Sequence, residues 1–332
     1  MENETKNVPL SPPRLVDAFI TGFNTVANNI YLIIFPVIFD IFLWFGPHIK
    51  IKSLLQPITE EFFKGFSTSA TPDMLQVVQV SQEMWMSILD RLNLMTLLHS
   101  YPVGIFSLMS AISPLENPFG KPQSFEVSSA LQFFAIWLAF ALTGLLLGSL
   151  YFNQVARCCR QENFSTSLRA LGRQTLQVIL LTFILILFLV LLSLPSSIIL
   201  SIMALINLLL AQAVLILVFL VYIWLLFPLV FSPHGIFYYH QKAFSAILAS
   251  ARVVRFSLPT TTLFILLIVL LAQGMNLIWT IPPTTSWMML IGIIGHAFTS
   301  TGLLASSFIY FRNNYQWLQE NLRRLPTQRL NV

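Results

Sequence analysis

Two ionisable side chains lie inside apolar stretches, and they are the residues best placed to do chemistry. Asp40 is surrounded by Ile, Phe and Leu, and His296 lies in a glycine-rich apolar run near the end of the chain. A carboxylate in a membrane costs roughly 2.5–3.5 kcal/mol on insertion scales, and for that reason it often marks an ion or proton path. The sequence predicts that the two side chains lie at similar depth. They form either a functional pair on a proton or cation path, or Asp40 has a structural place only. In the second case it faces the outer polar interface, or it stays protonated and hydrogen-bonds a neighbouring helix.

Other patterns that carry chemistry are missing from the chain. There is no phosphate-binding loop, no G-x-S-x-G, no H-E-x-x-H and no dinucleotide-binding G-x-G-x-x-G. The two cysteines, Cys158 and Cys159, are adjacent, which excludes a disulfide framework and a cysteine-rich metal site. The sequence therefore predicts a protein that is not an enzyme and has no cofactor, metal or catalytic residue.

Composition defines the elements that must position Asp40 and His296. Of 332 residues, 56% are hydrophobic and 9% are charged, and the mean hydropathy is +0.77. Soluble domains carry about 25% charged residues, so this is a membrane protein. Residues 127–156, 174–241 and 256–311 carry no Asp, Glu, Lys or Arg. One span needs about 20 apolar residues, so the two longer runs must fold back. Prolines predict the breaks, within 193–197 and 281–285.

These breaks predict an all-α, polytopic helical bundle with amphipathic interfacial helices. The whole chain, 1–332, is expected to be one integral membrane domain. Its six predicted spans are 29–46, 128–153, 174–194, 200–231, 258–280 and 286–311. Segment 47–126, between the first two spans, is expected to lie outside the cytoplasm. It should form two amphipathic helices, whose acids lie on polar faces, and an irregular connector from residue 101 onward.

Positive charge predicts the orientation, because short loops rich in Lys and Arg stay in the cytoplasm. The loops on one side and the two ends of the chain together carry a net charge of +8, whereas 47–126 carries −2. Both termini are therefore expected to be cytoplasmic. This asymmetry favours anionic lipid at the cytoplasmic face and makes a nucleic-acid partner unnecessary. The residues that set it are Arg157, Arg160, Arg169, Arg173, Lys242, Arg252, Arg255 and Arg312.

Small residues recur at helical spacing along two of the predicted spans. Small side chains let helix backbones approach closely in lipid, so close packing is the first interpretation, and the lining of a narrow pathway is the second. The residues are Gly144 and Gly148 in the second span, and Gly292, Gly295, Thr299, Gly302 and Ser306 in the sixth.

Two stretches carry a resemblance to known proteins. Asn29–Pro47, with Pro36, Asp40, Trp44 and Gly46, resembles the first span of bacterial multi-pass proteins of unestablished role. Phe227–Arg255, together with the later Ile309–Arg312, is similar to the membrane domain attached to some glycerophosphodiester phosphodiesterases and to related stand-alone six-span proteins. The soluble phosphodiesterase domain is absent here, so the resemblance implies a six-helix bundle and no enzymatic activity.

We expect a multi-pass protein of the bacterial cytoplasmic membrane. The first hypothesis is a non-enzymatic structural, assembly or envelope-support component. The alternative is a small-solute or ion transporter or channel that uses Asp40 and His296. A membrane-embedded lipid enzyme is a third hypothesis, which the missing catalytic patterns disfavour. The expected partners are the bilayer and a membrane protein or a second copy of this chain.

Overall fold

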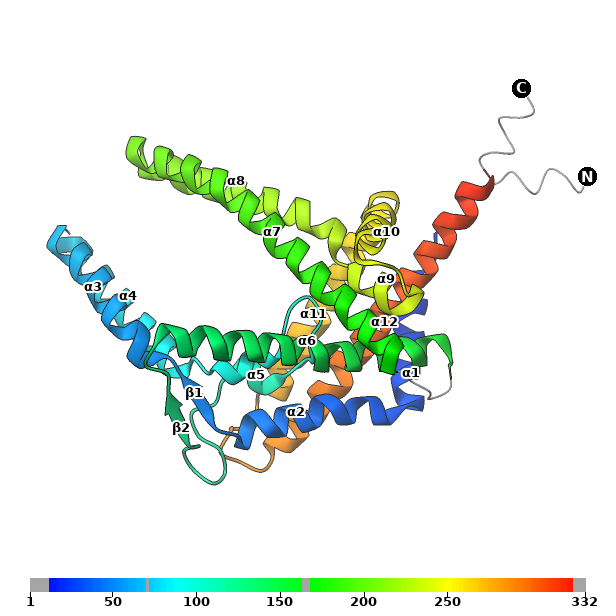
Figure 1. Ribbon diagram of the computed structural model, residues 1–332, viewed down its shortest axis with the longest axis horizontal. Coiled ribbons are helices and arrows are strands. Elements are labelled where there is room, and N and C mark those ends of the chain that lie inside the picture. The colour runs from blue at the N-terminus through cyan, green and yellow to red at the C-terminus, as the bar shows by residue number, and fades with distance from the viewer. Residues whose placement is uncertain (1–11, 70–71, 163–167, 325–332) are drawn as a thin grey trace, which may run out of the picture.

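The computed structural model describes residues 12–69, 72–162 and 168–324, which are nearly all helical (Figure 1). A helical bundle was predicted, and this is confirmed. The elements in chain order are α1 (Leu15–Asn28), η2 (Ile30–Ile33), α2 (Ile34–Phe45), β1 (His48–Lys50), α3 (Lys52–Ser69), α4 (Pro72–Arg91), η3 (Leu94–Leu98), α5 (Leu108–Ile112), β2 (Ser124–Glu126), α6 (Ala130–Arg160), α7 (Leu168–Ile206), α8 (Leu208–Leu226), η4 (Phe227–Leu229), α9 (Ser232–Tyr239), α10 (Ala243–Phe256), α11 (Leu258–Trp279) and α12 (Met289–Arg324).

Within the described residues, five helices are long and apolar enough to cross a membrane. They are α6, α7, α8 with its continuation to Tyr239, α11 and α12. A sixth span results if α1 and Ile30–Phe45 count as one, although these two bend by 90° at Asn29. Ile30–Phe45 covers most of the predicted first span, and the predicted break at 281–285 falls between α11 and α12, as expected.

The break predicted at Pro195 is wrong, and with it the span limits 174–194 and 200–231. Helix α7 runs from Leu168 to Ile206 through Pro195, and the turn lies at Asn207. The serines around the proline do not cap a new helix. Ser196 and Ser197 donate hydrogen bonds back to the carbonyls of Leu192 and Leu194, at 2.7 and 2.8 Å. Pro195 itself removes the N–H that would bond the Leu191 carbonyl, and neither serine bonds that oxygen.

Asn207 supplies the cap that starts α8, because its side-chain oxygen accepts from the backbone N–H of Leu209 at 2.8 Å. We therefore expect Asn207→Ala to lower the unfolding free energy by about 1 kcal/mol. Pro195→Ala should raise it, by up to about 3 kcal/mol, because a donor returns to the helix interior. Denaturant titration of the purified protein checks both changes. If Pro195→Ala lowers the unfolding free energy and Asn207→Ala leaves it unchanged, the turn lies at the proline and not at Asn207.

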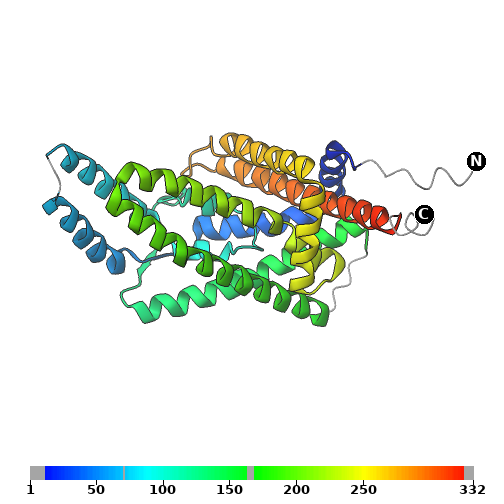
Figure 2. The ribbon, with the colours of Figure 1, turned by 90° about the horizontal axis from the view of Figure 1, so that it is seen from above.

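Helix α12 is the centre of the bundle, and about two-thirds (67%) of its apolar window is buried. Helix α1 packs along α12 and buries Ala18, Gly22 and Val26. Helix α11 lies beside α12 on another side (Figure 2), where the rings of Phe264 and Tyr310 stack with centroids 4.0 Å apart. The core is thus arranged around the predicted last span.

Two helical hairpins, α3–α4 and α7–α8, extend toward the same end of the molecule (Figure 1). The basic ends of α6, α7 and α12 lie toward the opposite end, which also holds α10. Strands β1 and β2 pair in parallel, with His48 opposite Ser124, and join the two ends of segment 47–126. The base of the α3–α4 hairpin is therefore tied to the start of α6.

Candidate functional site

The chain after α4 folds back into the bundle instead of remaining a surface connector. We call residues 93–112 the re-entrant segment; it contains η3 and α5. The Asn93 side chain starts it by accepting hydrogen bonds from the backbone N–H groups of Ile49 and Met95, at 3.0 and 3.1 Å. Val103, Ile105 and Leu108 of the segment are fully buried in the main core. The predicted irregular connector from residue 101 is thus partly an internal element.

Glycines of α6 make room for this segment. A Cβ atom at Gly144 would lie 2.5 Å from the Leu98 carbonyl oxygen, and one at Gly148 would lie 2.5 Å from that of Val103. Ser100 strengthens the contact by donating to the Ala141 carbonyl at 3.1 Å. The predicted close packing at these two glycines is present, but the partner is the re-entrant backbone and not another long helix.

Asp40 of α2 binds the same segment from the other side. Its carboxylate accepts hydrogen bonds from Ser107 Oγ at 2.5 Å and from the backbone N–H groups of Leu108 and Met109 at 3.1 and 3.0 Å. Its side chain is completely buried, with 0% exposure. A carboxylate that accepts N–H groups at a helix start satisfies donors that have no partner inside that helix. Asp40 therefore holds the first turn of α5 in place.

His296 of α12 lies next to this carboxylate. Its Nδ1 atom is 3.9 Å from Asp40 Oδ2, so the structure brings together the two side chains that the sequence singled out. This distance is too long for a hydrogen bond, and no described residue hydrogen-bonds His296 Nδ1. Asp40 is thus engaged by the re-entrant segment, and the geometry fits the interpretation in which it bonds a neighbouring element.

His296 also lines a partly open cavity of about 390 Å³ in the side of the bundle. The walls come from the re-entrant segment, α6, α7, the chain from Leu229 to His234, α11 and α12. His99, His234 and Asn276 are among its polar side chains, and most of the remaining lining is apolar. Asp40 is not among the lining residues, so the cavity reaches the histidine of the predicted pair but not the carboxylate.

The small-residue stripe of α12 packs against two helices, as close packing predicts. Added methyl groups at Gly292 and Gly295 would collide with Trp279 of α11, whose ring nitrogen also donates to Thr299 Oγ1 at 3.3 Å. On the α1 side, Gly302 lies against Phe23 and Ser306 lies against Gly22. Thr299 also lines the cavity, so the same stripe of α12 packs against its neighbours and contributes to the cavity wall.

The basic residues predicted to set the topology differ in surroundings. Arg169, Arg173, Lys242, Arg252 and Arg255 are exposed, whereas Arg157 is buried and Arg312 is half-buried. Arg160 links two elements: it donates to the Phe237 and Tyr238 carbonyls of α9 at 2.6 and 3.1 Å and to both carboxylate oxygens of Glu162 at 2.8 Å. Arg160 thus has a structural role beyond its charge.

The Arg160 guanidinium hydrogen-bonds Glu162 and lowers the pKa of that carboxyl group. A lowered pKa in the folded state means that the contribution to stability is present above the unfolded value of about 4.3 and is lost as pH falls through the lowered pKa. Because Glu162 is about half exposed, we expect less than about 1 kcal/mol. Melting curves of wild type and Glu162→Gln should differ slightly at pH 7 and converge in acid; a constant difference would contradict this.

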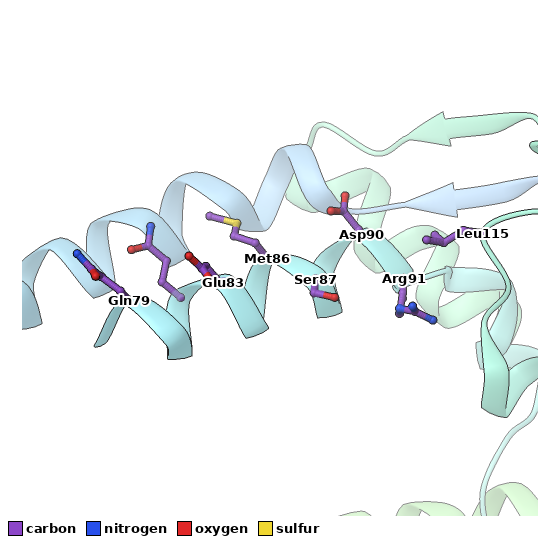
Figure 3. Close-up of a pocket in the computed structure, with 8 residues that line it drawn as sticks. Gln79, Glu83, Met86, Ser87, Asp90, Arg91 and Leu115 are labelled. Carbon is purple, nitrogen blue, oxygen red and sulfur yellow. The ribbon is translucent and has the colours of Figure 1, made fainter. Parts of the chain in front are cut away.

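A second hollow, of about 800 Å³, lies along α4 (Figure 3). Its lining side chains come from that helix, apart from Leu115. Asp90, one of them, forms an ion pair with Lys52 of α3 at 2.7 Å. This matches the prediction that acids such as Glu83 and Asp90 occupy polar helix faces, so we interpret the hollow as a solvated surface.

No cluster of three or more His, Cys, Asp or Glu side chains suited to a metal ion occurs among the described residues. Comparison with known proteins adds nothing to this, since no protein family, curated protein or solved structure matches the chain. Any functional conclusion therefore depends on the geometry of the chain itself.

Sequence reasoning found Asp40 and His296 but missed the cavity and the partner of Asp40. The available signals were the apolar residues spread through 94–109, which a solvated connector would not need, and the small residues of α6. His234 was also missed: its Nε2 atom lies 2.7 Å from Ser307 Oγ, and it packs on Phe308 with ring centroids 4.4 Å apart.

Proposed function

We propose that this chain is a non-catalytic assembly or envelope-support protein of the bacterial cytoplasmic membrane, which holds the α3–α4 hairpin in a fixed position outside the bilayer. The observation that carries the proposal is the use of Asp40. The one acidic side chain inside a predicted span makes three hydrogen bonds to the segment that follows the hairpin. This carboxylate, which is costly to place inside a membrane, therefore anchors the re-entrant segment that follows the hairpin.

The α3–α4 hairpin is tied to the rest of the protein at its base, and it exposes apolar side chains along its length. Asn93 and the β1–β2 pair hold the base, and Lys52 binds Asp90 between the two helices. Farther out, Val77 and Val80 of α4 are 65% and 58% exposed, as are apolar residues of α3 such as Phe62 at 58%. Exposed apolar side chains on a rigid projection suit contact with another envelope protein.

In-cell photo-crosslinking tests the proposal, with a photoreactive amino acid in place of Val80 and, as a control, in place of Leu266 on the apolar surface of α11. We expect one discrete protein adduct from position 80 and only lipid adducts from position 266. Asp40→Ala should reduce the adduct at 80, because the hairpin loses its anchor. Lipid adducts alone at position 80 would overturn the proposal.

A transporter is the second candidate, because His296 lines a cavity and lies 3.9 Å from Asp40. Its test is proton flux in proteoliposomes made with wild type, Asp40→Asn and His296→Gln. Flux that disappears in both variants would favour transport over the scaffold. Equal flux in all three proteins and in empty vesicles would remove this candidate.

We also propose that the chain is related to the bacterial six-span proteins that Phe227–Arg255 resembles. Within that stretch, Ser250 has a specific structural role. Its hydroxyl donates to the Pro228 carbonyl at 2.7 Å and accepts from the Phe231 N–H at 3.0 Å. Ser250 of α10 therefore holds the backbone at Pro228 and Phe231, immediately before α9 begins.

A further inference from the structure

The cavity beside His296 has the size and shape of a site for one small elongated molecule. Its volume of about 390 Å³ lies at the lower end of the usual range for ligand pockets, roughly 300–1,000 Å³. One face of α12 lines it from His296 to Ser307, a distance of about 16 Å at 1.5 Å per residue. The site is therefore long relative to its volume.

Polar groups occupy both ends of this wall and apolar groups its middle. His296, Thr299 and Ser300 lie at one end of the α12 face, and Leu303 and Leu304 follow. At the other end, His234 Nε2 and Ser307 Oγ hydrogen-bond each other at 2.7 Å, so the His296 end is the one that offers polar groups to a ligand. The wall on α11 is polar at one end only, with the apolar Ile265, Ile268 and Ala272 followed by Asn276. Such a lining matches an apolar chain with a polar head.

The polar groups favour an uncharged head. None of the described lining residues is Asp, Glu, Lys or Arg. The polar side chains at the proposed head end are an imidazole, a hydroxyl and an amide, from His296, Ser300 and Asn276. Uncharged groups of this kind in a mostly apolar pocket can hydrogen-bond a ligand's hydroxyl or carbonyl groups.

The site borders the lipid-facing part of the molecule. The α7–α8 hairpin diverges from α11 and α12 (Figure 1), and Leu185 of α7 is part of the cavity lining. On α11, Leu266, Val269 and Leu270 are exposed next to the lining residues Ile265 and Ile268. A molecule entering from this side would come from the hydrocarbon core.

From these observations we propose that the cavity binds a single-chain, uncharged lipid, of the class of monoacylglycerols and long-chain alcohols. The chain lies against Leu303, Leu304 and Ile268, and the head hydrogen-bonds at the end formed by His296, Ser300 and Asn276. This site is independent of the proposed scaffold role of the α3–α4 hairpin, so either proposal can fail alone.

Photolabelling of the full-length protein in nanodiscs tests the site. The probe is a monoacylglycerol with a diazirine in its acyl chain, and the same acyl chain on phosphatidylglycerol is the charged comparison. Ala272→Trp fills the cavity, whereas Leu266→Trp adds the same side chain on the exposed surface of α11. We expect labelling of cavity residues by the neutral probe to fall about tenfold in Ala272→Trp, equal to about 1.4 kcal/mol, and to stay unchanged in Leu266→Trp.

Three results would overturn the proposal: equal labelling in both variants, labelled peptides that lie outside the cavity, or equally strong labelling by phosphatidylglycerol. If Ala272→Trp does not elute as a single species, Asn276→Leu replaces it, because it removes a head-group contact without adding bulk. Labelling by the neutral probe must then fall while the lipid-facing labelling of α11 is retained. No change in Asn276→Leu would count against the site.

Discussion

Replacing Asp40 by alanine is expected to destabilise this protein more than any other single change to a polar side chain. The variant leaves Ser107 Oγ and the N–H groups of Leu108 and Met109 buried without their acceptor. Each orphaned donor costs about 1–3 kcal/mol, so we expect a total loss of at least about 3 kcal/mol. Thermal unfolding of the purified protein measures the loss, and hydrogen exchange locates it. Exchange at 108–109 should accelerate about a hundredfold or more.

Asp90→Ala is the matched control, because it removes the same side chain from an exposed ion pair. The Lys52–Asp90 pair is 2.7 Å long, and its side chains are 33% and 46% exposed. Exposed pairs contribute about 0–1 kcal/mol, so Asp90→Ala should unfold almost like wild type. Equal effects of the two substitutions would show that the Asp40 hydrogen bonds do not hold the re-entrant segment.

Gly148→Ala should produce the second large effect, through the same segment but from α6. The added Cβ would lie 2.5 Å from the Val103 carbonyl oxygen and 2.9 Å from the Gly104 Cα atom. Both are backbone atoms, which cannot move aside by a change of rotamer. We expect the segment to be displaced at a cost of about 1–3 kcal/mol or more, as overpacking of a core costs. A lower melting temperature and faster exchange at 103–105 would report it.

Gly274→Ala makes the same chemical change where nothing lies within 4 Å of the new Cβ. Helix α11 should gain stability there, by up to about 1 kcal/mol, because alanine has the higher helix propensity. The two glycine variants therefore have opposite expected signs. A stabilising Gly148→Ala would mean that α6 and the re-entrant segment are not in close contact.

The sequence by itself determined the class of protein, most of its helices and which two polar residues are unusual. Nearly charge-free runs can persist only in lipid, so the membrane assignment required no three-dimensional information. Asp40 stood out because a carboxylate in such a run is costly, whatever it contacts. The stripe from Gly292 to Ser306 predicted close packing of α12, since helical spacing places those residues on one face.

The tertiary structure alone decided where the chain turns and what Asp40 binds. A proline predicts a break because it lacks an N–H, yet α7 continues through Pro195 to Ile206, and the next helix is capped by Asn207. The partner of Asp40 is far away in sequence, at 107–109, and helical periodicity reports only on residues within one helix. The cavity beside His296 was invisible for the same reason: its walls come from segments scattered between residues 99 and 307, which only folding brings together.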